Sequence, residues 1–267
     1  MLGGRDCVAF AQAQFMNDVA ALTPGHWQWN GWLTPKGRLV ALFALVLLDS
    51  ESVCLVLPDV DPAQLAEQLR RYVFRSKVTL TVPGDLFVSG AFEPAPVTGN
   101  AIAAMAQDEF ALDFTSDACA RTLRISHAPS LADATACDRW KVTDLASGLP
   151  RLAESQSSQW TPQQLSLDRL RAYSVKKGCY PGQEIVARTH FLGQAKRGLV
   201  LFDAYAPVTE GAAVDAAGHS IGTVVSSART DTGTRLLAIL PLARDATTLT
   251  AAGSVLRERP LSDGLSR

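Results

Sequence analysis

Hydrophobic and polar residues alternate in blocks that predict several short strands. The most apolar run, Leu39–Leu48, is too short to cross a bilayer and is typical of a buried strand. Ser52–Leu57 predicts a second strand, joined to the first at the polar segment D-S-E-S. Further strands are predicted for K-V-T-L-T-V, D-L-F-V-S-G and R-T-L-R-I-S. The first half of the chain therefore combines strands with the helices described next.

Apolar residues at helical spacing, together with capping residues, predict the helices. Asp6–Leu22 is predicted as a helix that Asp6 caps, and Ala132–Ser147 as a helix that carries Trp140. Two further helix starts pair a capping residue with a proline in the first turn. They are Asp61-Pro62 and Thr161-Pro162.

From Ala195 onward the pattern changes to short strands separated by turn residues. This spacing predicts a small barrel or sandwich. The segment Gly218–Gly222 matches G-x-S-x-G, the nucleophile elbow of hydrolases, but a strand-like sequence follows it where the elbow needs a helix. A hairpin turn is the favoured interpretation. The fold class is therefore α+β, with a β-rich C-terminal domain that begins near residue 192.

Composition excludes several classes of protein. The chain has 267 residues, of which 47% are hydrophobic and 19% charged, and its net charge is −1. This is an ordinary globular composition without the strongly basic balance of a tight nucleic-acid binder. The first residues lack the basic region and apolar core of a signal peptide. We expect a cytoplasmic protein that does not bind a membrane. We also expect no tight, direct binding of nucleic acid.

Cysteines and histidines are too scattered to predict a metal site. The five cysteines are odd in number, and no two have C-x-x-C spacing. They indicate free thiols in a reducing compartment, and no iron–sulfur cluster held by this chain alone. The four histidines form no H-x-x-x-H pair. No resident metal is expected.

The segment Ser174–His190, S-V-K-K-G-C-Y-P-G-Q-E-I-V-A-R-T-H, concentrates reactive and polar residues. Two glycines allow the backbone to approach a ligand, and the lysines would favour a thiolate at Cys179. Tyr180 offers a stacking surface, Glu184 suits a planar donor face, and Arg188 suits an anionic tail. The alternative is a tight turn with an incidental buried cysteine. Trp140 is equally open, because it fits either a core position or a contact with a flat heterocycle.

These motifs resemble the YgfZ family of folate-binding proteins, which are relatives of the glycine-cleavage T-protein. Lys177–Glu184 matches the family signature K-G-C-Y-x-G-Q-E at every position, and I-V-A-R follows it. The opening G-R-D-C-V-A-F-A-Q-A-Q-F-M-N-D-V and the turn L-T-P-K-G-R-L are also similar to family segments. The resemblance covers nearly the whole chain.

The resemblance implies a T-protein-like, three-domain arrangement around a central folate pocket. The first domain would be discontinuous, residues 1–50 plus 132–191, with residues 51–131 inserted as an α+β domain and residues 192–267 forming a small β-barrel. Members bind tetrahydrofolate and support the assembly or repair of certain iron–sulfur enzymes, including a tRNA-thiolating one. The partners expected are folate and iron–sulfur client or assembly proteins.

The residues of this chain that the resemblance and the chemistry assign to a site fall into two groups. Cys179 is the candidate reactive thiol, and the second group would contact tetrahydrofolate or a derivative of it. That group comprises Trp140, Lys177, Gly178, Tyr180, Gln183, Glu184, Arg188, Asn17 and Arg38. Lys196 and Arg197 are further candidates for the glutamate tail of the folate.

Three departures from the related sequences matter. The T-protein has a catalytic carboxylate pair where Ala41 and Leu42 stand here, so its aminomethyl transfer is expected to be lost. Met16 replaces a common threonine, and the family usually has another strand before the G-x-D block, so part of the pocket is expected to be built differently. Other hypotheses are a folate-dependent one-carbon transferase with Asp18 near the folate, a scaffold that does not need folate, and, more distantly, a hydrolase with Ser220 as nucleophile.

Overall fold

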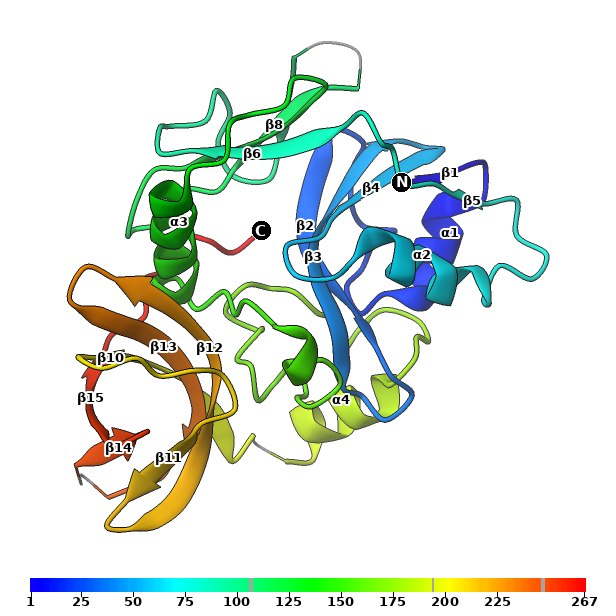
Figure 1. Cartoon of the computed structure of the whole chain (residues 1–267). Helices are drawn as coiled ribbons and strands as arrows, with labels where there is room; N and C mark the ends of the chain where they lie inside the picture. Colours follow the sequence, from blue (N-terminus) through cyan, green and yellow to red (C-terminus); the bar gives the residue numbers. More distant parts are fainter. Residues whose placement is uncertain (106–107, 194, 246–247) are drawn as a thin grey trace.

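The structure, a computed structural model, describes residues 1–105, 108–193, 195–245 and 248–267. Within them the chain forms three antiparallel sheets, one of which closes into a barrel, and four α-helices (Figure 1). The predictions of an α+β fold and of a small C-terminal β-barrel are both confirmed.

The first sheet contains the long apolar strand that the sequence predicts. Its order is β2-β3-β4-β1-β5, formed by β1 (Leu2–Gly3), β2 (His26–Leu33), β3 (Leu39–Asp49), β4 (Ser52–Val56) and β5 (Thr79–Leu80). Successive side chains of β3 enter two separate cores, because strand residues alternate between the faces of a sheet. Phe43 packs with α1 (Cys7–Gln14) and α2 (Pro62–Arg70), whereas Leu42 enters the core on the opposite face. Burial on both faces explains why β3 is almost continuously apolar.

The second sheet is smaller and adjoins the first. Its order is β6-β9-β8-β7, formed by β6 (Phe87–Ala91), β7 (Ile102–Ala104), β8 (Phe110–Asp113) and β9 (Thr122–Ser126). An isolated bridge pairs His26 at the start of β2 with Ala101. The backbone N–H of Trp27 also donates to the carbonyl of Asn100 at 2.8 Å. The two sheets are thus joined directly through their backbones.

The remaining helices precede the barrel. They are α3 (Ala134–Ala146), the short 3₁₀ helix η1 (Glu154–Gln156) and α4 (Gln183–Phe191). The barrel order is β10-β13-β12-β11-β14-β15, formed by β10 (Arg197–Ala204), β11 (Ala213–Ala216), β12 (His219–Thr230), β13 (Gly233–Pro241), β14 (Leu249–Ala251) and β15 (Ser254–Arg259). Helix α3 lies against β12. The predicted hairpin between β11 and β12 is present, but its turn lies at Ala217 and Gly218, both at positive φ, and residues 219–222 belong to β12.

One hydrophobic core joins the three sheets. It contains Trp29 from the first sheet, Phe114 beside the second, Leu149 after α3 and Leu237 from the barrel. Leu265 of the C-terminal segment is 2% exposed and belongs to the same core. Figure 1 shows the C-terminus between the first sheet, the second sheet and α3. This segment therefore fills the centre of the arrangement.

Two helix predictions need correction. The helix predicted for Asp6–Leu22 ends at Gln14, because Phe15 is extended and bridges to Trp32. Asp6 occupies the N-cap position, but its side chain makes no capping hydrogen bond, and its carboxylate instead accepts the backbone N–H of Lys77 at 2.7 Å. No helix follows Thr161-Pro162: residues 162–171 form turns, with Ser166 and Arg171 at positive φ. Positive φ does not occur within a right-handed helix.

Other local predictions are confirmed. The Asp61 carboxylate accepts the backbone N–H groups of Ala63 and Gln64 at 2.7 and 2.9 Å, and Pro62 occupies the first turn of α2. Helix α3 also lies within the predicted range. The division into three domains at the boundaries given above stays a prediction.

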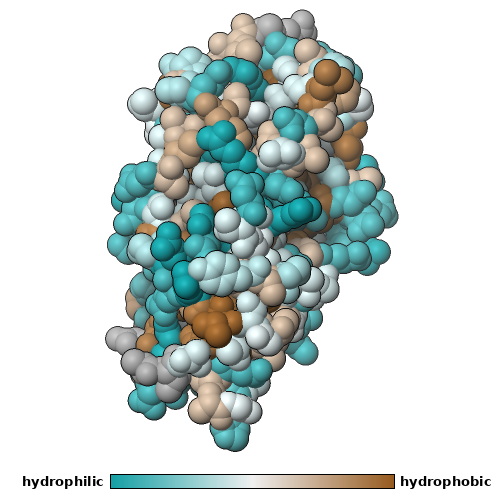
Figure 2. Space-filling model, turned by 60° about the vertical axis from the view of Figure 1, so that its left-hand side comes forward, coloured by the Kyte–Doolittle hydropathy of each residue, from teal (hydrophilic) through white to brown (hydrophobic). Residues whose placement is uncertain are grey.

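The surface offers no broad apolar area on the side that carries α3 and the barrel. On that face hydrophilic side chains predominate, and hydrophobic ones form small separate patches (Figure 2). Among the described residues, no helix is long and apolar enough to span a bilayer.

Candidate functional site

Trp140 borders a hollow where α3 meets the first two sheets. The hollow measures about 320 Å³, and its aromatic lining is Trp29, Phe114 and Trp140. Val56 of β4 and Gly90 of β6 belong to the apolar part of the wall, together with other aliphatic residues. Its size reaches the range of small-molecule sites, which are mostly apolar with a few placed polar groups.

The Trp140 ring is held from two sides. The Arg121 guanidinium lies 4.5 Å from its ring centroid, and the Phe92 ring makes an edge contact at 5.6 Å. Gly90 is required here, because a Cβ on it would come within 2.6 Å of the indole. The side chain is half-buried, so it is neither a fully enclosed core residue nor a free surface residue. Such fixing preorganises the indole beside the hollow.

The polar side of the hollow is a buried charge network. The Asp144 carboxylate, 2% exposed, accepts Arg121 Nη1 at 2.6 Å and Arg151 Nη1 at 3.2 Å. Burial raises the pKa of Asp144, and the two guanidiniums oppose that change. Arg151 also contacts Asp59 at 2.7 Å, which ties the segment after α3 to the segment after β4. Asp144, Arg151 and Lys141 all line the hollow.

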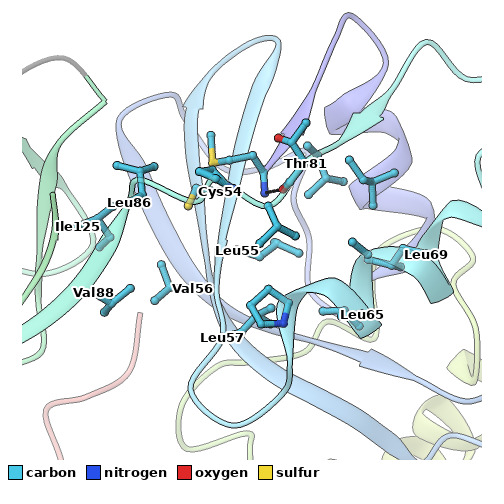
Figure 3. A pocket seen from close by; sticks show the side chains of 17 residues that line it. Cys54, Leu55, Val56, Leu57, Leu65, Leu69, Thr81, Leu86, Val88 and Ile125 are labelled. Atoms are coloured by element: carbon cyan, nitrogen blue, oxygen red, sulfur yellow. Dashed lines mark hydrogen bonds between the residues drawn. The ribbon is translucent and has the colours of Figure 1, made fainter. Parts of the chain in front are cut away.

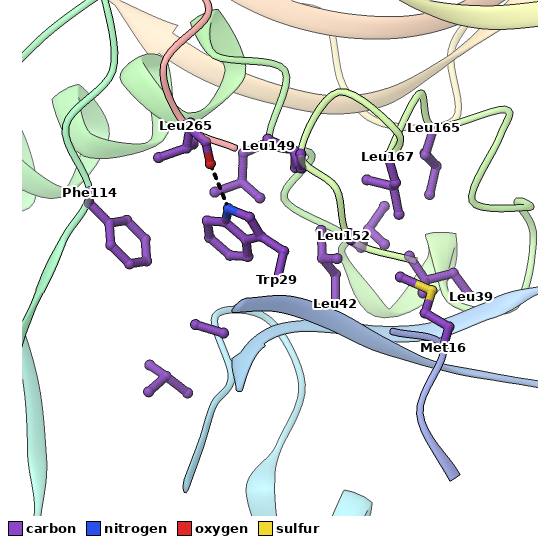
Figure 4. Packing of buried hydrophobic residues seen from close by; sticks show 14 of the residues in the cluster. Met16, Trp29, Leu39, Leu42, Phe114, Leu149, Leu152, Leu165, Leu167 and Leu265 are labelled. Carbon is purple, nitrogen blue, oxygen red and sulfur yellow. Dashed lines mark hydrogen bonds between the residues drawn. The ribbon is translucent and has the colours of Figure 1, made fainter. Parts of the chain in front are cut away.

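The C-terminal segment supports the hollow from the centre of the molecule. Trp29 Nε1 donates to the carbonyl of Leu265 at 2.8 Å, and Figure 4 shows Leu149 and Phe114 around the same indole. Arg267 donates to the backbone carbonyls of Asp113 and Thr115. These contacts fix the wall that Trp29 contributes.

The signature segment packs against the P-K-G-R turn. Gly182 has φ +80°, and a Cβ there would lie 2.6 Å from the Thr34 carbonyl oxygen and 2.7 Å from Gly37 Cα. Gly37 has φ +68° and packs against Ile185. The signature segment and the P-K-G-R turn, which are far apart in sequence, therefore contact each other through Gly182 and Gly37 at the start of α4. Only residues without a side chain allow this approach.

Lys177 is a buried anchor for the end of α1. It is 5% exposed, and its Nζ donates to the carbonyls of Gln12, Phe15 and Asn17. Burial lowers its pKa to about 8, while the charge of Asp18 opposes the shift. An ammonium group has three N–H donors, and three carbonyls engage them. In this arrangement Lys177 has no donor left for a folate tail or for a thiolate.

Asn17, Tyr180 and Gln183 also have internal partners. Asn17 Nδ2 donates to the carbonyls of Trp29 and Arg171 at 2.9 and 2.7 Å. Tyr180 is 6% exposed, and its hydroxyl donates to the Ser174 carbonyl. Burial raises the pKa of Tyr180. Gln183 Nε2 donates to the carbonyl of Lys177. These contacts favour a structural role for the three residues.

The thiol of the signature faces solvent. Cys179 is exposed, so the alternative of an incidental buried cysteine is wrong. Glu184 and Arg188 of α4 are exposed as well. Gly178 has open space around its Cα. The structure therefore presents Cys179 on a turn whose base is fixed by Lys177 and Gly182.

Trp140 and the signature segment do not line the same hollow. None of residues 174–190 lines the Trp140 hollow, within the part of the chain that the structure describes. Arg38 lies at the P-K-G-R turn, where its Nη1 donates to the Gln159 carbonyl at 2.7 Å. Lys196 and Arg197 are exposed at the start of the barrel. The Trp140 hollow and the Cys179 turn are separate features.

A second hollow, of about 160 Å³, is aliphatic. It lies between α2 and the first sheet, where Leu65 and Leu69 face Leu55 and Leu57 (Figure 3). Burial raises the pKa of its Cys54 to about 11. The polar lining residues of this hollow are Met1 and Thr81, and the Met1 amine already donates to the Thr81 carbonyl at 2.8 Å. Among the described residues no group of three His, Cys, Asp or Glu side chains is arranged to hold a metal ion.

Sequence reasoning missed Trp29, Phe114, Asp144 and Arg151 as lining residues. The alternation of Trp27, Gln28 and Trp29 indicates a strand with an aromatic face, but nothing in it shows which face borders a hollow. Asp144 near the end of α3 forms an ion pair with Arg151 in the segment that follows, and no local sequence pattern predicts that this pair is buried. These residues are found only from the tertiary structure.

Comparison with known proteins gives consistent likenesses. No family model matches the chain. The tRNA-modifying protein YgfZ of Aliivibrio fischeri strain MJ11 is 28% identical over 263 residues, covering 89% of this chain and 80% of that protein. YgfZ of Sodalis glossinidius is 28% identical over 221 residues, which are 74% of this chain and 66% of the relative. An uncharacterized protein of Haemophilus influenzae is 29% identical over 203 residues, covering 74% of this chain and 68% of its own.

A solved structure supports the same fold. The glycine cleavage system aminomethyltransferase T from Bartonella henselae superposes with a TM-score of 0.73 at 16% identity, covering 96% of this chain and 81% of that one. At this identity the likeness establishes the fold alone. The resemblance predicted from the sequence is thus confirmed: the chain is YgfZ-like over most of its length and has the fold of the glycine-cleavage T-protein.

Proposed function

We propose that this chain binds tetrahydrofolate, or a close derivative, in the Trp140 hollow and supports the assembly or repair of iron–sulfur enzymes, tRNA-modifying ones among them. The observation that carries the proposal is an aromatic hollow with a buried carboxylate at its side. The YgfZ relatives bear the name tRNA-modifying protein, which accords with this role. All five cysteines are free thiols, and we place the protein in the cytoplasm on that ground.

The residues of the hollow fit a folate. Trp140, Trp29 and Phe114 offer apolar surface to a flat pterin, and aromatic contacts favour offset stacking or edge contacts. Asp144 presents carboxylate oxygens, which suit the adjacent N–H donors of a pterin. Lys141, which is exposed at the edge of the hollow, would meet the anionic tail. Arg151 stays paired with Asp144 and Asp59. Bound tetrahydrofolate supplies nitrogen atoms that can carry one-carbon units.

Cys179 is the proposed reacting thiol for sulfur or iron chemistry. It is exposed on a turn whose neighbours are fixed, which suits contact with another protein. Glu184 and Arg188 are exposed on α4 and are proposed to contact the client or assembly protein. Folate binding and thiol chemistry are therefore assigned to different parts of the surface.

The structure gives less support to the alternative of a one-carbon transferase. Such a reaction needs a base beside the folate nitrogens. Ala41 and Leu42 are buried apolar residues of β3, and Asp18 lies in the segment after α1, where its carboxylate accepts Gln12 Nε2 at 3.0 Å. Asp18 is not among the residues that line the Trp140 hollow.

Calorimetric titration with tetrahydrofolate tests the binding proposal. The wild type should show one saturable site, and Trp140→Leu should weaken binding about tenfold, the loss of about 1.4 kcal/mol of aromatic contact. Cys179→Ala should bind like the wild type. The absence of binding to the wild type, or unchanged affinity in a folded Trp140→Leu variant, contradicts the proposed pocket.

Complementation of a strain that lacks a functional homologue tests the thiol. Cys179→Ser should fail to restore iron–sulfur enzyme activity while still binding tetrahydrofolate. Cys119→Ser, which removes a thiol that bonds only locally to the Ala120 carbonyl, should restore it. Full restoration by Cys179→Ser would remove the thiol from the mechanism.

A further inference from the structure

The register of the barrel gathers arginines on its outer face. Asp203 of β10 pairs with Arg235 of β13 on one side and with Arg257 of β15 on the other. Directly opposed residues in antiparallel strands point to the same face, and so do residues two apart in one strand. Arg259 therefore shares this face as well. Leu236 and Leu256, the neighbours of Arg235 and Arg257 along their strands, belong to the hydrophobic core of the barrel.

The cluster holds more positive than negative charge. Arg235 contacts the Asp203 carboxylate through Nε at 2.8 Å, and Arg259 Nε lies 3.3 Å from the same carboxylate. None of the ion pairs among the described residues includes Arg257, whose guanidinium lies 4.7 Å from the centroid of the Tyr205 ring. The cluster thus holds three guanidiniums and one carboxylate, and only the guanidiniums of Arg235 and Arg259 pair with that carboxylate. Asp203 lies opposite both Arg235 and Arg257, which favours the pairing, but its single negative charge balances only one of the three guanidiniums. Ion pairing within the cluster therefore leaves an excess of positive charge.

These side chains surround a hollow. It measures about 270 Å³, and Asp203, Tyr205, Arg235, Arg257 and Arg259 line it. Thr230 and Thr232 at the turn between β12 and β13 add hydroxyl groups. We infer that this hollow on the barrel is a binding site for a phosphate-bearing ligand. The inference does not depend on the proposed folate site, which has other lining residues.

The chemistry of the lining favours phosphate. Guanidinium groups match phosphate oxygens with paired N–H donors, and the hydroxyls add neutral donors. Tyr205 supports the Arg257 guanidinium through a cation–π contact, which lowers the entropy cost of ordering it. The net charge of the whole chain is −1, so the attraction of anions arises from this cluster and not from the protein as a whole.

Calorimetric titration of the full chain with pyrophosphate, and separately with ADP, at low ionic strength tests the inference. The wild type should bind pyrophosphate saturably, and Arg257→Gln should weaken binding about tenfold, because the variant removes one charge-assisted contact. Equal affinity for ADP and pyrophosphate would mean that the hollow recognises the diphosphate group alone. Tighter binding of ADP would mean that the ligand is a nucleotide.

The matched control is Arg244→Gln. It removes the same charge from the barrel, at a residue that pairs with Glu258 and does not line the hollow. This variant should bind pyrophosphate like the wild type, and both variants should keep the wild-type melting temperature. The inference is overturned if the wild type does not bind pyrophosphate, or if Arg257→Gln and Arg244→Gln bind it equally.

Discussion

At the scale of single residues, burial divides chemically identical groups into structural and reactive ones. Lys177 is enclosed by three carbonyls, whereas its neighbour Lys176 is exposed. Cys54 is buried, whereas Cys179 is exposed. The sequence alone does not separate the two lysines, which are adjacent. Only the environment decides which of them can meet a ligand or a partner.

Alkylation should separate the thiols. Burial raises the pKa of Cys54 to about 11, so only a very small fraction of this thiol is ionised at pH 8. With iodoacetamide at pH 8, followed by peptide mass spectrometry, Cys179 and Cys137 should label and Cys54 should not. Tetrahydrofolate should slow labelling of Cys137, which lines the hollow, and leave Cys179 unchanged. Equal labelling of Cys54 in the folded protein would contradict this account.

Replacing the buried lysine should destabilise the protein. Lys177→Met keeps the length of the side chain but leaves three buried carbonyls without their donor, at a cost of about 1–3 kcal/mol. Urea unfolding measures the difference in free energy, with exposed Lys176→Met as the control expected to match the wild type. Equal stability of the two variants would show that the carbonyl contacts contribute nothing.

At the scale of elements, the sequence predicts those helices, strands and turns that depend on interactions between neighbouring residues. The Asp61 cap, the long strand β3 and the β11–β12 hairpin were predictable because each depends on neighbouring residues. Helix α1 is shorter than predicted because a tertiary bridge from Phe15 to Trp32 ends it. The aromatic hollow was only partly predictable. Trp140 could be named, but its partners Trp29 and Asp144 come from distant elements.

The contact between Gly37 and Gly182 is a tertiary constraint that a methyl group should break. Gly182→Ala places a Cβ against Thr34 and Gly37 and adopts positive φ, which together cost about 1–3 kcal/mol or more. Gly178→Ala is the matched control, since no atom lies within 4 Å of its Cβ position. Thermal unfolding should show a lower melting temperature for Gly182→Ala alone. If Gly178→Ala lowered the melting temperature by a similar amount, the change in backbone flexibility, and not the close approach of Gly182 to Gly37, would explain the effect.

At the scale of the whole molecule, three sheets are held by one core whose centre is the C-terminal segment. Leu265 packs beside Trp29, and Arg267 bonds to the loop after β8. This arrangement explains how a hollow between separate elements can keep its shape. The resemblance of the chain to YgfZ proteins predicted a central pocket, but no sequence pattern predicted that this segment supports one wall.

Truncating the central leucine should loosen this arrangement. Leu265→Ala removes a fully enclosed side chain and should cost about 2–5 kcal/mol. Amide hydrogen exchange should increase in β2 and β8, which the segment joins. Ser266→Ala, at a neighbouring position outside the core cluster, should change little. Unchanged exchange in Leu265→Ala would mean that the sheets are held together without the segment.

The most direct test of the central claim is to record the indole N–H signals of the protein by NMR during titration with tetrahydrofolate. The chain has five tryptophans, and they provide both probe and control. Trp140 and Trp29 line the hollow, whereas Trp32 lies in the core on the other face of the first sheet. We predict that the signals of Trp140 and Trp29 shift saturably and that the signal of Trp32 stays in place. Saturating tetrahydrofolate that leaves the Trp140 signal unmoved would contradict the assignment of this hollow as the folate site.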